Sequence, residues 1–340
     1  MAITEVITDK YAIYQGDCIE KIPSIPDSSI HLSVYSPPFD NLYAYSSSDH
    51  DLGNCKTYEE FLIHYEYLIK EMARVTMPGR MNCVHCMDIP KKANTGLNDF
   101  PGDIIRLHEK NGFYYWDRHN VWKEPLRVAI RTRSRSLMHQ QLCNDSSLCR
   151  GATADYVLVF KRKGENTIPV KHPIGLTTYA GDIELMNKED HDEFLYLRTK
   201  YTNHKDDKTN RLSQFIWRRY ASSAWVDVRA NIMLEYKPAR DKEDERHVCP
   251  LHLDIIERCI MLWSNEGEKV LTPFMGIGSE VFGAVKLNRK GIGIELKESY
   301  FNQAVKNLAE LKHLAIEQTT IFQTMDEDLD IDIEVGCLRD

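Results

Sequence analysis

The segment Val270–Ser279 constrains the fold more than any other part of the chain. Its ten residues read VLTPFMGIGS: an apolar run, a turn with two glycines, and the start of a helical pattern. Gly276 and Gly278 carry no Cβ, so a ligand can approach the backbone closely. The first turn of a helix also presents unpaired backbone N–H groups. The segment therefore predicts a strand, a ligand-binding turn and a helix, which is the repeating unit of an α/β fold.

A second strand, Gly291–Ile294, follows about twenty residues later and ends at Glu295, a spacing that dinucleotide-binding folds share. A carboxylate at that place can accept hydrogen bonds from ribose hydroxyls. The two segments together predict a nucleotide-type cofactor, although an ordinary strand–turn–helix with an exposed glutamate would show the same letters. The residues assigned to this cofactor are Pro273, Phe274, Gly276, Gly278, Ser279 and Glu295.

The rest of the chain alternates short apolar runs with helical patterns, which favours a parallel sheet flanked by helices. Further strands are expected at Tyr11–Tyr14, Ile30–Tyr35, Asn82–His85, Tyr156–Phe160 and Lys269–Leu271. Helices are expected at Tyr58–Val75, Leu251–Trp263, Ser279–Leu287 and Ser299–Leu314. The polar stretch 166–246 has weak periodicity and is expected to be an irregular module inserted between two parts of one sheet, 1–165 and 247–315. Residues 316–340 are expected to form an acidic tail.

Composition narrows the class of protein. The chain has 340 residues, 42% of them hydrophobic, which is enough to bury one large core or two modest ones. No apolar run approaches the roughly 18 residues that cross a bilayer, and the first ten residues lack a signal-peptide core. A protein without membrane contact that works inside the cell is expected. Cys83 and Cys86 form a C-x-x-C pattern, but they lie in an apolar stretch and favour a strand over a zinc or redox site.

Directly after the strand Ile30–Tyr35 comes Ser36-Pro37-Pro38-Phe39. Each proline ring fixes φ near −65° and removes an N–H donor, so the segment is stiff. Such a turn holds the Ser36 side chain and the Pro37 carbonyl in fixed directions, where they could accept hydrogen bonds from an amino group. Phe39 could stack on a flat ring. A rigid surface turn is the alternative interpretation.

Taken together, the two turns resemble the amino-methyltransferases that modify DNA at adenine N6 or cytosine N4. That family has a (Asp/Asn/Ser)-Pro-Pro-(Tyr/Phe/Trp) motif at its catalytic centre and binds S-adenosylmethionine at a Phe-x-Gly-x-Gly turn. Here the catalytic motif comes first and the cofactor turn near the C-terminus, an order that resembles the permuted β group. The resemblance covers residues 11–160 and 236–312, and it implies a Rossmann-like, circularly permuted methyltransferase fold.

Smaller matches extend the resemblance. Gly16-Asp17-Cys18 resembles the family's Gly-Asp-Cys segment, which implies that Asp17 lies near the cofactor adenine. Asn41-Leu42-Tyr43 and Leu52-Gly53-Asn54 are similar to segments of phage and prophage DNA methylases. One residue departs from the pattern: the family usually has Asp before the Pro-Phe of the cofactor turn, and this chain has Thr272. A hydroxyl cannot pair with a charge, so weaker cofactor binding, or help from another acid, is expected.

The resemblance implies direct transfer of the S-adenosylmethionine methyl group to an exocyclic amine of a flipped base. Ser36, Pro37, Pro38 and Phe39 would form the catalytic site, without a nucleophilic cysteine and without a metal. The choice between adenine N6 and cytosine N4, the recognition sequence and the oligomeric state stay open. A cytoplasmic enzyme of restriction–modification, in a bacterium or a phage-infected cell, is expected.

DNA contacts are expected in a basic stretch, although the formal net charge of the whole chain is −8. From Arg118 to Lys163 there are ten Lys/Arg against three Asp/Glu, an excess of seven positive charges. Within it Arg127, Arg131, Arg133 and Arg135 recur nearly every second residue, which suggests a strand or extended loop facing phosphates. Trp217, Arg218 and Arg219, followed by Tyr220, mix stacking rings with cations inside the inserted module. A solvated charged face would show the same patterns.

Two other functions compete with this one. The first is a methyltransferase of RNA or of protein amines, because Pro-Pro-aromatic motifs also serve glutamine methylation. Those enzymes usually place the cofactor turn before the catalytic motif, which is the opposite of the order here. The second is a DNA-binding protein of the same fold with weakened catalysis, which Thr272 favours. Measuring S-adenosylmethionine binding separates this second function from the enzyme.

Overall fold

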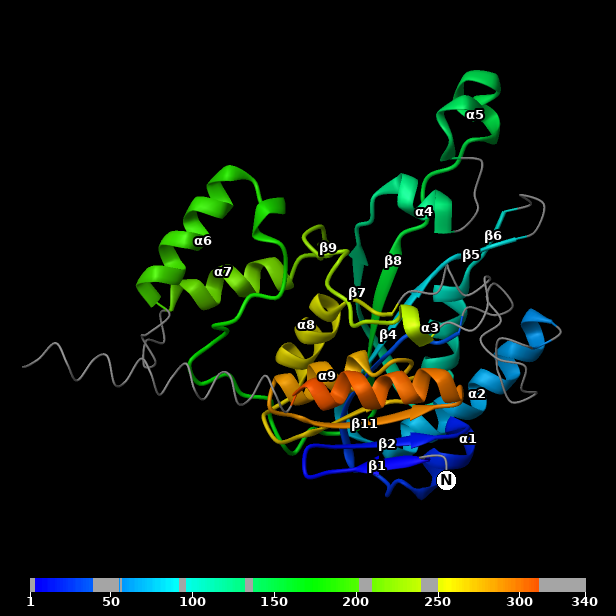
Figure 1. Ribbon diagram of the computed structural model, residues 1–340, viewed down its shortest axis with the longest axis vertical. Coiled ribbons are helices and arrows are strands. Elements are labelled where there is room, and N and C mark those ends of the chain that lie inside the picture. The colour runs from blue at the N-terminus through cyan, green and yellow to red at the C-terminus, as the bar shows by residue number, and fades with distance from the viewer. Residues whose placement is uncertain are drawn as a thin grey trace, which may run out of the picture.

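The computed structural model describes residues 4–38, 55, 57–91, 96–131, 137–201, 210–239 and 250–311. Within them, nine strands form one mixed sheet in the order β1-β2-β11-β10-β3-β4-β8-β7-β9 (Figure 1). These strands are β1 (Glu5–Ile7), β2 (Tyr11–Gln15), β3 (Ile30–Tyr35), β4 (Thr76–Met87), β7 (Phe113–Val121), β8 (Asp155–Arg162), β9 (Ala224–Trp225), β10 (Lys269–Thr272) and β11 (Lys290–Glu295). A separate hairpin pairs β5 (Ile89–Pro90) with β6 (Leu97–Asn98).

The direction of the strands decides which turns meet. Strands β2, β11, β10, β3 and β4 are parallel, and β8 runs antiparallel to both β4 and β7. Therefore β7 points the same way as β3 and β10. The carboxyl ends of β2, β11, β10, β3, β4 and β7 lie at one edge of the sheet, and that of β8 lies at the other. The first long strand, β2, pairs with β11, so an N-terminal segment completes the part of the sheet that the C-terminal segments build.

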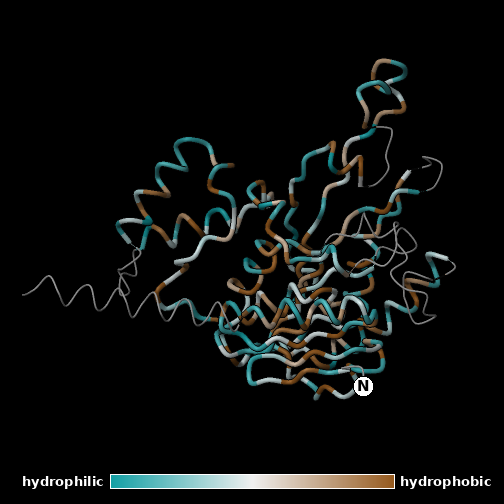
Figure 2. Tube along the Cα trace, in the orientation of Figure 1, coloured by the Kyte–Doolittle hydropathy of each residue, from teal (hydrophilic) through white to brown (hydrophobic). Residues whose placement is uncertain are grey.

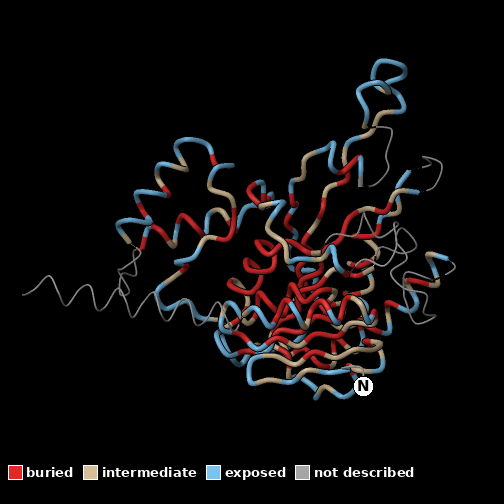
Figure 3. The backbone as a smooth tube through the Cα atoms, in the orientation of Figure 1, coloured by how far each residue is buried: buried red, intermediate tan, exposed pale blue. Residues whose placement is uncertain are grey.

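Helices cover both faces of the sheet, whose strands are largely buried (Figure 3). Those of the described residues are α1 (Cys18–Lys21), α2 (Tyr58–Val75), α3 (Phe100–Lys110), α4 (Pro125–Arg131), α5 (His139–Asn144), α6 (Lys188–Tyr201), α7 (Arg211–Tyr220), α8 (Leu253–Trp263), α9 (Ser279–Lys286) and a last helix at 298–311, besides short 3-10 turns. One apolar core joins the sheet to α8, α9 and the last helix, and a second joins it to α1, α2 and α3. None of the described helices combines the length and the apolarity that crossing a bilayer requires.

Local sequence explains the elements that position the site. Helix α2 starts at Thr57, whose hydroxyl accepts a hydrogen bond from the backbone N–H of Glu60 at 3.1 Å. Its apolar stripe is buried against the sheet, and it has the predicted bounds. Along β8, Val157 and Val159 belong to one core while Leu158 and Phe160 belong to the other. This arrangement is typical of strands that are covered on both faces, and hydrophobic residues cluster along the sheet in Figure 2.

Two expectations differ from the structure. The stretch around Arg127 and Arg131 is not a strand or extended loop, because α4 is helical over Pro125–Arg131. Proline suits the first position of a helix, and the Glu124 carboxylate accepts the backbone N–H of Arg127 at 2.8 Å. The stretch 166–246 is also less irregular than expected. It contains α6 and α7, whose apolar sides form a small core of their own, and β9, which pairs with β7.

Candidate active site

Strands β10 and β3 are neighbours in the sheet, with Val270 opposite Leu32 and Leu271 opposite Ser33. The glycine turn follows β10 and the proline turn follows β3, so the two turns start side by side at the same edge. On one side of this pair the sheet continues to β11 and β2, and on the other to β4 and β8. In open α/β sheets, ligands bind at such a point, outside the carboxyl ends of the strands.

The glycine turn is fixed by backbone hydrogen bonds to β11. The N–H of Met275 donates to the carbonyl of Ile294 at 2.9 Å, and the N–H of Gly276 donates to Oε2 of Glu295 at 2.7 Å. Gly276 has φ +54°, and a Cβ added there would meet nothing within 4 Å. Gly278 has φ +92° and packs closely against Ala304 of the last helix. Gly276 therefore leaves open space beside the backbone, whereas Gly278 allows the turn to pack.

Glu295 joins the glycine turn to two other parts of the chain. Its Oε1 accepts the N–H of Lys297 at 2.8 Å, and its backbone carbonyl accepts the N–H of Gly16 at 2.9 Å. The second bond brings the end of β2 to the same place. Asp17 lies directly after it and caps α1 by accepting the N–H of Ile19 at 2.9 Å. Asp17 therefore follows the residue that bonds to Glu295. Its place near the cofactor adenine stays a prediction.

The residues present fit S-adenosylmethionine. The hydroxyls of Thr272 and Ser279 are buried at the two ends of the glycine turn, and neither has a hydrogen-bond partner in the part of the chain that the structure describes. Buried polar groups without partners are rare in folded proteins, so a bound polar ligand is a reasonable partner for them. Together with the open space at Gly276 and the acceptors of Glu295, they form a cradle for a nucleoside.

A third acid, Glu280, lies in the first turn of α9 and is 4% exposed. Burial raises the pKa of Glu280 to about 8, and the charge of Glu295 adds to the rise. At neutral pH this side chain is therefore mainly a neutral carboxylic acid. Glu280 could not be singled out from the sequence, since nothing in a helical pattern tells a buried glutamate from an exposed one.

On the other side of the pair, the proline turn continues β3. Pro37 is buried, and Ser36 and Pro38 are partly exposed. The ring of Tyr35 contacts that of Phe274 at 6.0 Å between centroids, which joins the two turns through an aromatic pair. Phe39 and the segments Asn41-Leu42-Tyr43 and Leu52-Gly53-Asn54 lie outside the described residues.

Sequence reasoning missed a chain of polar side chains behind Ser36. The Ser36 hydroxyl lies 3.1 Å from the carbonyl of His85 and 3.3 Å from Nδ1 of the same residue. Nε2 of His85 lies 2.9 Å from Oδ2 of Asp155, and Nζ of Lys123 forms an ion pair with the same oxygen. The only signal in the sequence was a polar residue at one end of each of two apolar strands, β4 and β8.

The residues expected to contact DNA are scattered in the structure. Arg127 is exposed on α4, which follows β7 and so leaves the sheet at the same edge as the two turns. For Arg131 only the backbone is described, and Arg133 and Arg135 lie outside the described residues. Trp217 is 56% exposed on α7. These roles stay predictions.

Arg218 and Arg219, also on α7, have carboxylate partners. Arg218 pairs with Asp190 at 3.4 Å and with Glu193 at 3.2 Å, both on α6. Arg219 pairs with Asp190 at 3.0 Å and with Asp227 at 3.4 Å, and its side chain is 18% exposed. Arg219 therefore helps to hold the module together.

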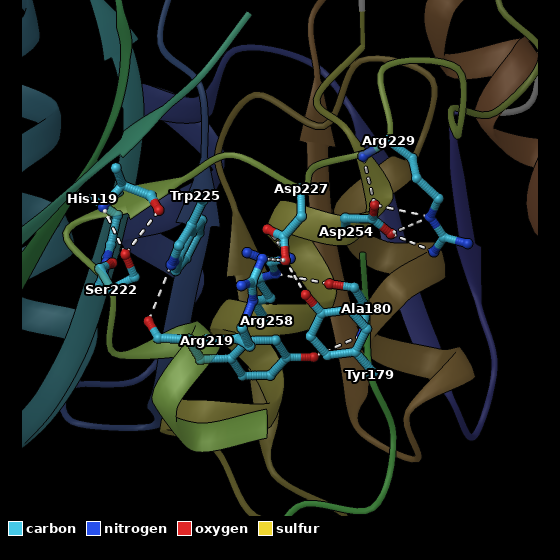
Figure 4. Close-up of polar contacts among 12 residues, drawn as sticks. His119, Tyr179, Ala180, Arg219, Ser222, Trp225, Asp227, Arg229, Asp254 and Arg258 are labelled. Carbon is cyan, nitrogen blue, oxygen red and sulfur yellow. Dashed lines mark hydrogen bonds and ion pairs between the residues drawn. The ribbon is translucent and has the colours of Figure 1, made fainter. Parts of the chain in front are cut away.

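Buried charges also tie this module to α8 (Figure 4). Arg258 donates to Asp227 at 2.8 Å and to the carbonyl of Ala180 at 2.8 Å. Its guanidinium lies 4.9 Å from the ring centre of Tyr220 and 5.1 Å from that of Trp225. Because both charged groups are almost fully buried, removing Asp227 would leave the Arg258 guanidinium without its ion-pair partner and strongly destabilise this junction.

Comparison with known proteins agrees with this geometry. A family model described as DNA methylase, of the N6 and N4 methyltransferases, matches residues 30–306. The chain is 25% identical over 321 residues to the type II methyltransferase M.MjaI of Methanocaldococcus jannaschii, which covers 86% of this chain and 89% of that protein. It is 23% identical to the type II methyltransferase M.BglI of Bacillus subtilis, over 88% and 86% of the two chains.

Solved structures show the same fold. A DNA modification methylase of Thermus thermophilus, in complex with S-adenosyl-L-methionine, has a TM-score of 0.57 at 20% identity and covers 88% of this chain and 95% of its own. The cytosine-N4-specific PvuII DNA methyltransferase has a TM-score of 0.56 at 15% identity, over 87% and 85% of the chains. With its Rossmann-like sheet and S-adenosylmethionine cradle, the chain belongs to the DNA methylase family of N6 and N4 amino-methyltransferases.

Proposed function

We propose that this protein transfers a methyl group from S-adenosylmethionine to N6 of adenine or N4 of cytosine, in a base flipped out of DNA. The observation that carries the proposal is the pairing of β10 with β3. Because of this pairing, the glycine turn, which suits a nucleoside cofactor, begins beside the proline turn, which suits an amine. The protein can therefore bring a methyl donor and an amino group together. Positioning of this kind supplies much of the rate of a direct transfer.

On the cofactor side, S-adenosylmethionine supplies a methyl group bound to a positively charged sulfur. The backbone at Pro273, Phe274, Gly276 and Gly278 would lie against it, with the Ser279 hydroxyl as a hydrogen-bond partner. Glu295 would accept from the ribose hydroxyls while it holds the turn, since a carboxylate offers about four acceptor sites. Asp17 would lie near the adenine.

On the base side, the Ser36 hydroxyl and the Pro37 carbonyl would accept hydrogen bonds from the target amine. The prolines hold both acceptors still, because neither ring allows much change in φ. The amine gains positive charge as it attacks, and fixed acceptors stabilise that charge best in the transition state. Phe39 would stack on the flipped base.

For DNA, we infer that the basic stretch after β7 binds phosphates through Arg127, Arg131, Arg133 and Arg135. The module 166–246 would contact the bases that surround the target, with Trp217 and Arg218 at its surface. In this division 1–165 is the catalytic half and 247–315 is the cofactor half. The relatives are named type II methyltransferases, and we propose the same class, acting in the cytoplasm on bacterial or phage DNA.

The test is to incubate the protein with PCR-amplified genomic DNA and S-adenosylmethionine that carries a deuterated methyl group. Mass spectrometry of the digested nucleosides should then detect deuterated N6-methyladenine or N4-methylcytosine, and the product names the target base. RNA and a protein mixture serve as parallel substrates. Labelling of one of these instead of DNA would overturn the proposal. DNA and cofactor binding without any labelled base would favour a DNA-binding protein with weakened catalysis.

A further inference from the structure

The polar side chains behind Ser36 come from the ends of four strands. Ser36 follows β3, His85 lies near the end of β4, and Asp155 begins β8, with Lys123 two residues after β7. His85 is 8% exposed and Asp155 1% exposed. Burying a carboxylate and an imidazole together is costly unless each finds a partner, and here each one does.

From the ion pairs of these polar side chains we infer which nitrogen of His85 carries hydrogen. Lys123 holds Asp155 as an ionised carboxylate, which can only accept hydrogen bonds. Nε2 of His85, 2.9 Å from Asp155, must therefore be the donor. In a neutral imidazole the other nitrogen, Nδ1, is then the acceptor, and it faces the Ser36 hydroxyl at 3.3 Å.

It follows that the Ser36 hydroxyl points its hydrogen at His85. The hydroxyl has one hydrogen, and the two acceptors that the described residues place within its reach, the carbonyl and Nδ1, both belong to that residue. With its hydrogen turned inward, Ser36 Oγ offers only lone pairs to its exposed side. An oxygen held in this way suits an amine that must donate a hydrogen bond while its own lone pair attacks.

We propose that His85 is a positioning residue for methyl transfer: it fixes the Ser36 hydroxyl as an acceptor and takes up the proton that the amine releases. Asp155 and Lys123 set the tautomer that this role requires. The proposal rests on the proposed function, because it needs an amine at Ser36.

The proton balance is simple. The amine nitrogen forms the new N–CH3 bond with its lone pair, while the C–S bond breaks and its electron pair stays on sulfur. The methylated nitrogen then carries one proton too many. This proton moves to Ser36 Oγ as the Ser36 proton moves to Nδ1 of His85. The product is a neutral methylated amine and an imidazolium beside the Asp155 carboxylate, and the imidazolium later loses its proton to water.

Another buried histidine provides a matched control. His108 on α3 is fully buried, stacks on Phe160 at 3.8 Å between ring centres, and has Nδ1 2.8 Å from the carbonyl of Ile104. Burial lowers the pKa of His108 to about 3. This ring packs against Tyr65, Phe113 and Phe160 of the second core. Replacing it should reduce stability without changing the transfer rate of the folded enzyme.

The experiment is a double-mutant cycle with Ser36→Ala and His85→Phe, which keeps a ring and removes both nitrogens. Single-turnover methyl transfer is measured with PCR-amplified genomic DNA at saturating cofactor, and cofactor affinity is measured by calorimetry. His85→Phe should lower the rate on the order of 100-fold, the lower end of what a proton acceptor contributes, with cofactor affinity unchanged. In the Ser36→Ala background it should change the rate less than about twofold, because its effect passes through Ser36.

Conservative variants complete the test. His85→Asn, whose amide oxygen can replace Nδ1 as an acceptor, should recover part of the rate. If His85→Phe does not fold, Asp155→Asn takes its place and should also slow transfer, and His108→Gln is the control for general destabilisation. Equal losses for His85→Phe in both backgrounds would overturn the inference and leave the proposed function standing. A parent rate for Ser36→Ala would instead overturn the proposed site.

Discussion

The two turns at the edge of the sheet have opposite backbone chemistry. The glycine turn has φ +54° at Gly276 and +92° at Gly278, which are conformations that other residues rarely adopt, and its N–H groups take part in the structure. The proline turn has no N–H at Pro37 or Pro38, so these two residues offer only carbonyl acceptors for hydrogen bonds to a ligand, beside the Ser36 hydroxyl. Neighbouring strands thus end in a glycine turn that Glu295 holds through the Gly276 N–H and in a proline turn whose backbone is stiffened by its own rings.

This difference suggests a division of labour. On the glycine side, the cofactor can be held by the backbone itself, with the carboxylate of Glu295 fixing the shape of the turn. A base that must donate hydrogen bonds needs acceptors, and two prolines provide them by removing the competing donors. Substitutions on the glycine side should therefore change cofactor affinity, and substitutions on the proline side should change the rate.

The largest effect is expected for Gly276→Val. A branched residue at φ +54° is strained, and its side chain would fill the open space beside the turn. Calorimetry should detect no binding of S-adenosylmethionine. The matched control is Gly267→Val, which has φ +77° and equally open surroundings but lies at the opposite end of β10. It should bind cofactor like the parent, and a loss in both variants would point to misfolding instead of a blocked site.

The second prediction concerns the neutral acid on the glycine side. Glu280 has a pKa of about 8 in the fold, whereas an unfolded glutamate ionises near pH 4.5. Between pH 4.5 and pH 8, Glu280 is ionised in the unfolded state but still protonated in the folded state. The free energy of unfolding therefore falls as pH rises through this range, and the full loss is reached above pH 8. Glu280→Gln removes that cost. The variant should gain stability over the parent with rising pH, up to roughly 5 kcal/mol.

Urea denaturation at pH 6 and pH 8.5 measures this gain. Glu257→Gln is the control, because Glu257 is equally buried on α8 but pairs with Lys286 at 2.7 Å. Losing that pair should destabilise the fold instead of stabilising it. A difference between Glu280→Gln and the parent that is the same at both pH values would show that Glu280 is ionised in the folded protein.

A third, smaller effect is expected at Glu295, which holds the glycine turn through the Gly276 N–H. Glu295→Ala removes the acceptor of the Gly276 N–H and the proposed contact with the ribose, so cofactor binding should weaken by about 1.5–3 kcal/mol. The rate at saturating cofactor should stay close to that of the parent if the division of labour holds. A large fall in that rate, with unchanged affinity, would mean that Glu295 serves the chemistry.

The glycine side could be predicted from the sequence because its contacts are local. Val270–Ser279 and Glu295 lie within 26 residues, and the strand, turn and helix follow from residue type alone. The group of polar side chains behind Ser36 could not be predicted from the sequence. Its members Ser36, His85, Lys123 and Asp155 meet only because of the order of the strands in the sheet. The same holds for Arg258 and Asp227, which join α8 to the module. In the module, α6 was hidden because it buries only Phe194 and Leu197. Helix α7 has an apolar stripe at helical spacing that the sequence interpretation overlooked. Both helices pack in one small core with residues of the neighbouring segments and of α8.

The smallest effect is expected on DNA binding, where Arg127 and Arg218 can be compared. Arg127 lies on α4, which follows β7 at the edge of the sheet where both turns lie. Arg218 on α7 is already paired with Asp190 and Glu193. Arg127→Ala should weaken DNA binding slightly and lower the slope of log Kd against log salt by about one, as expected for one lost phosphate contact. Arg218→Ala should change the slope less, because its charge is partly neutralised inside the module. Fluorescence anisotropy of labelled DNA at several salt concentrations measures both slopes. If Arg218→Ala flattens the slope and Arg127→Ala does not, DNA is held chiefly by the module, and the basic helix beside the two turns has another role.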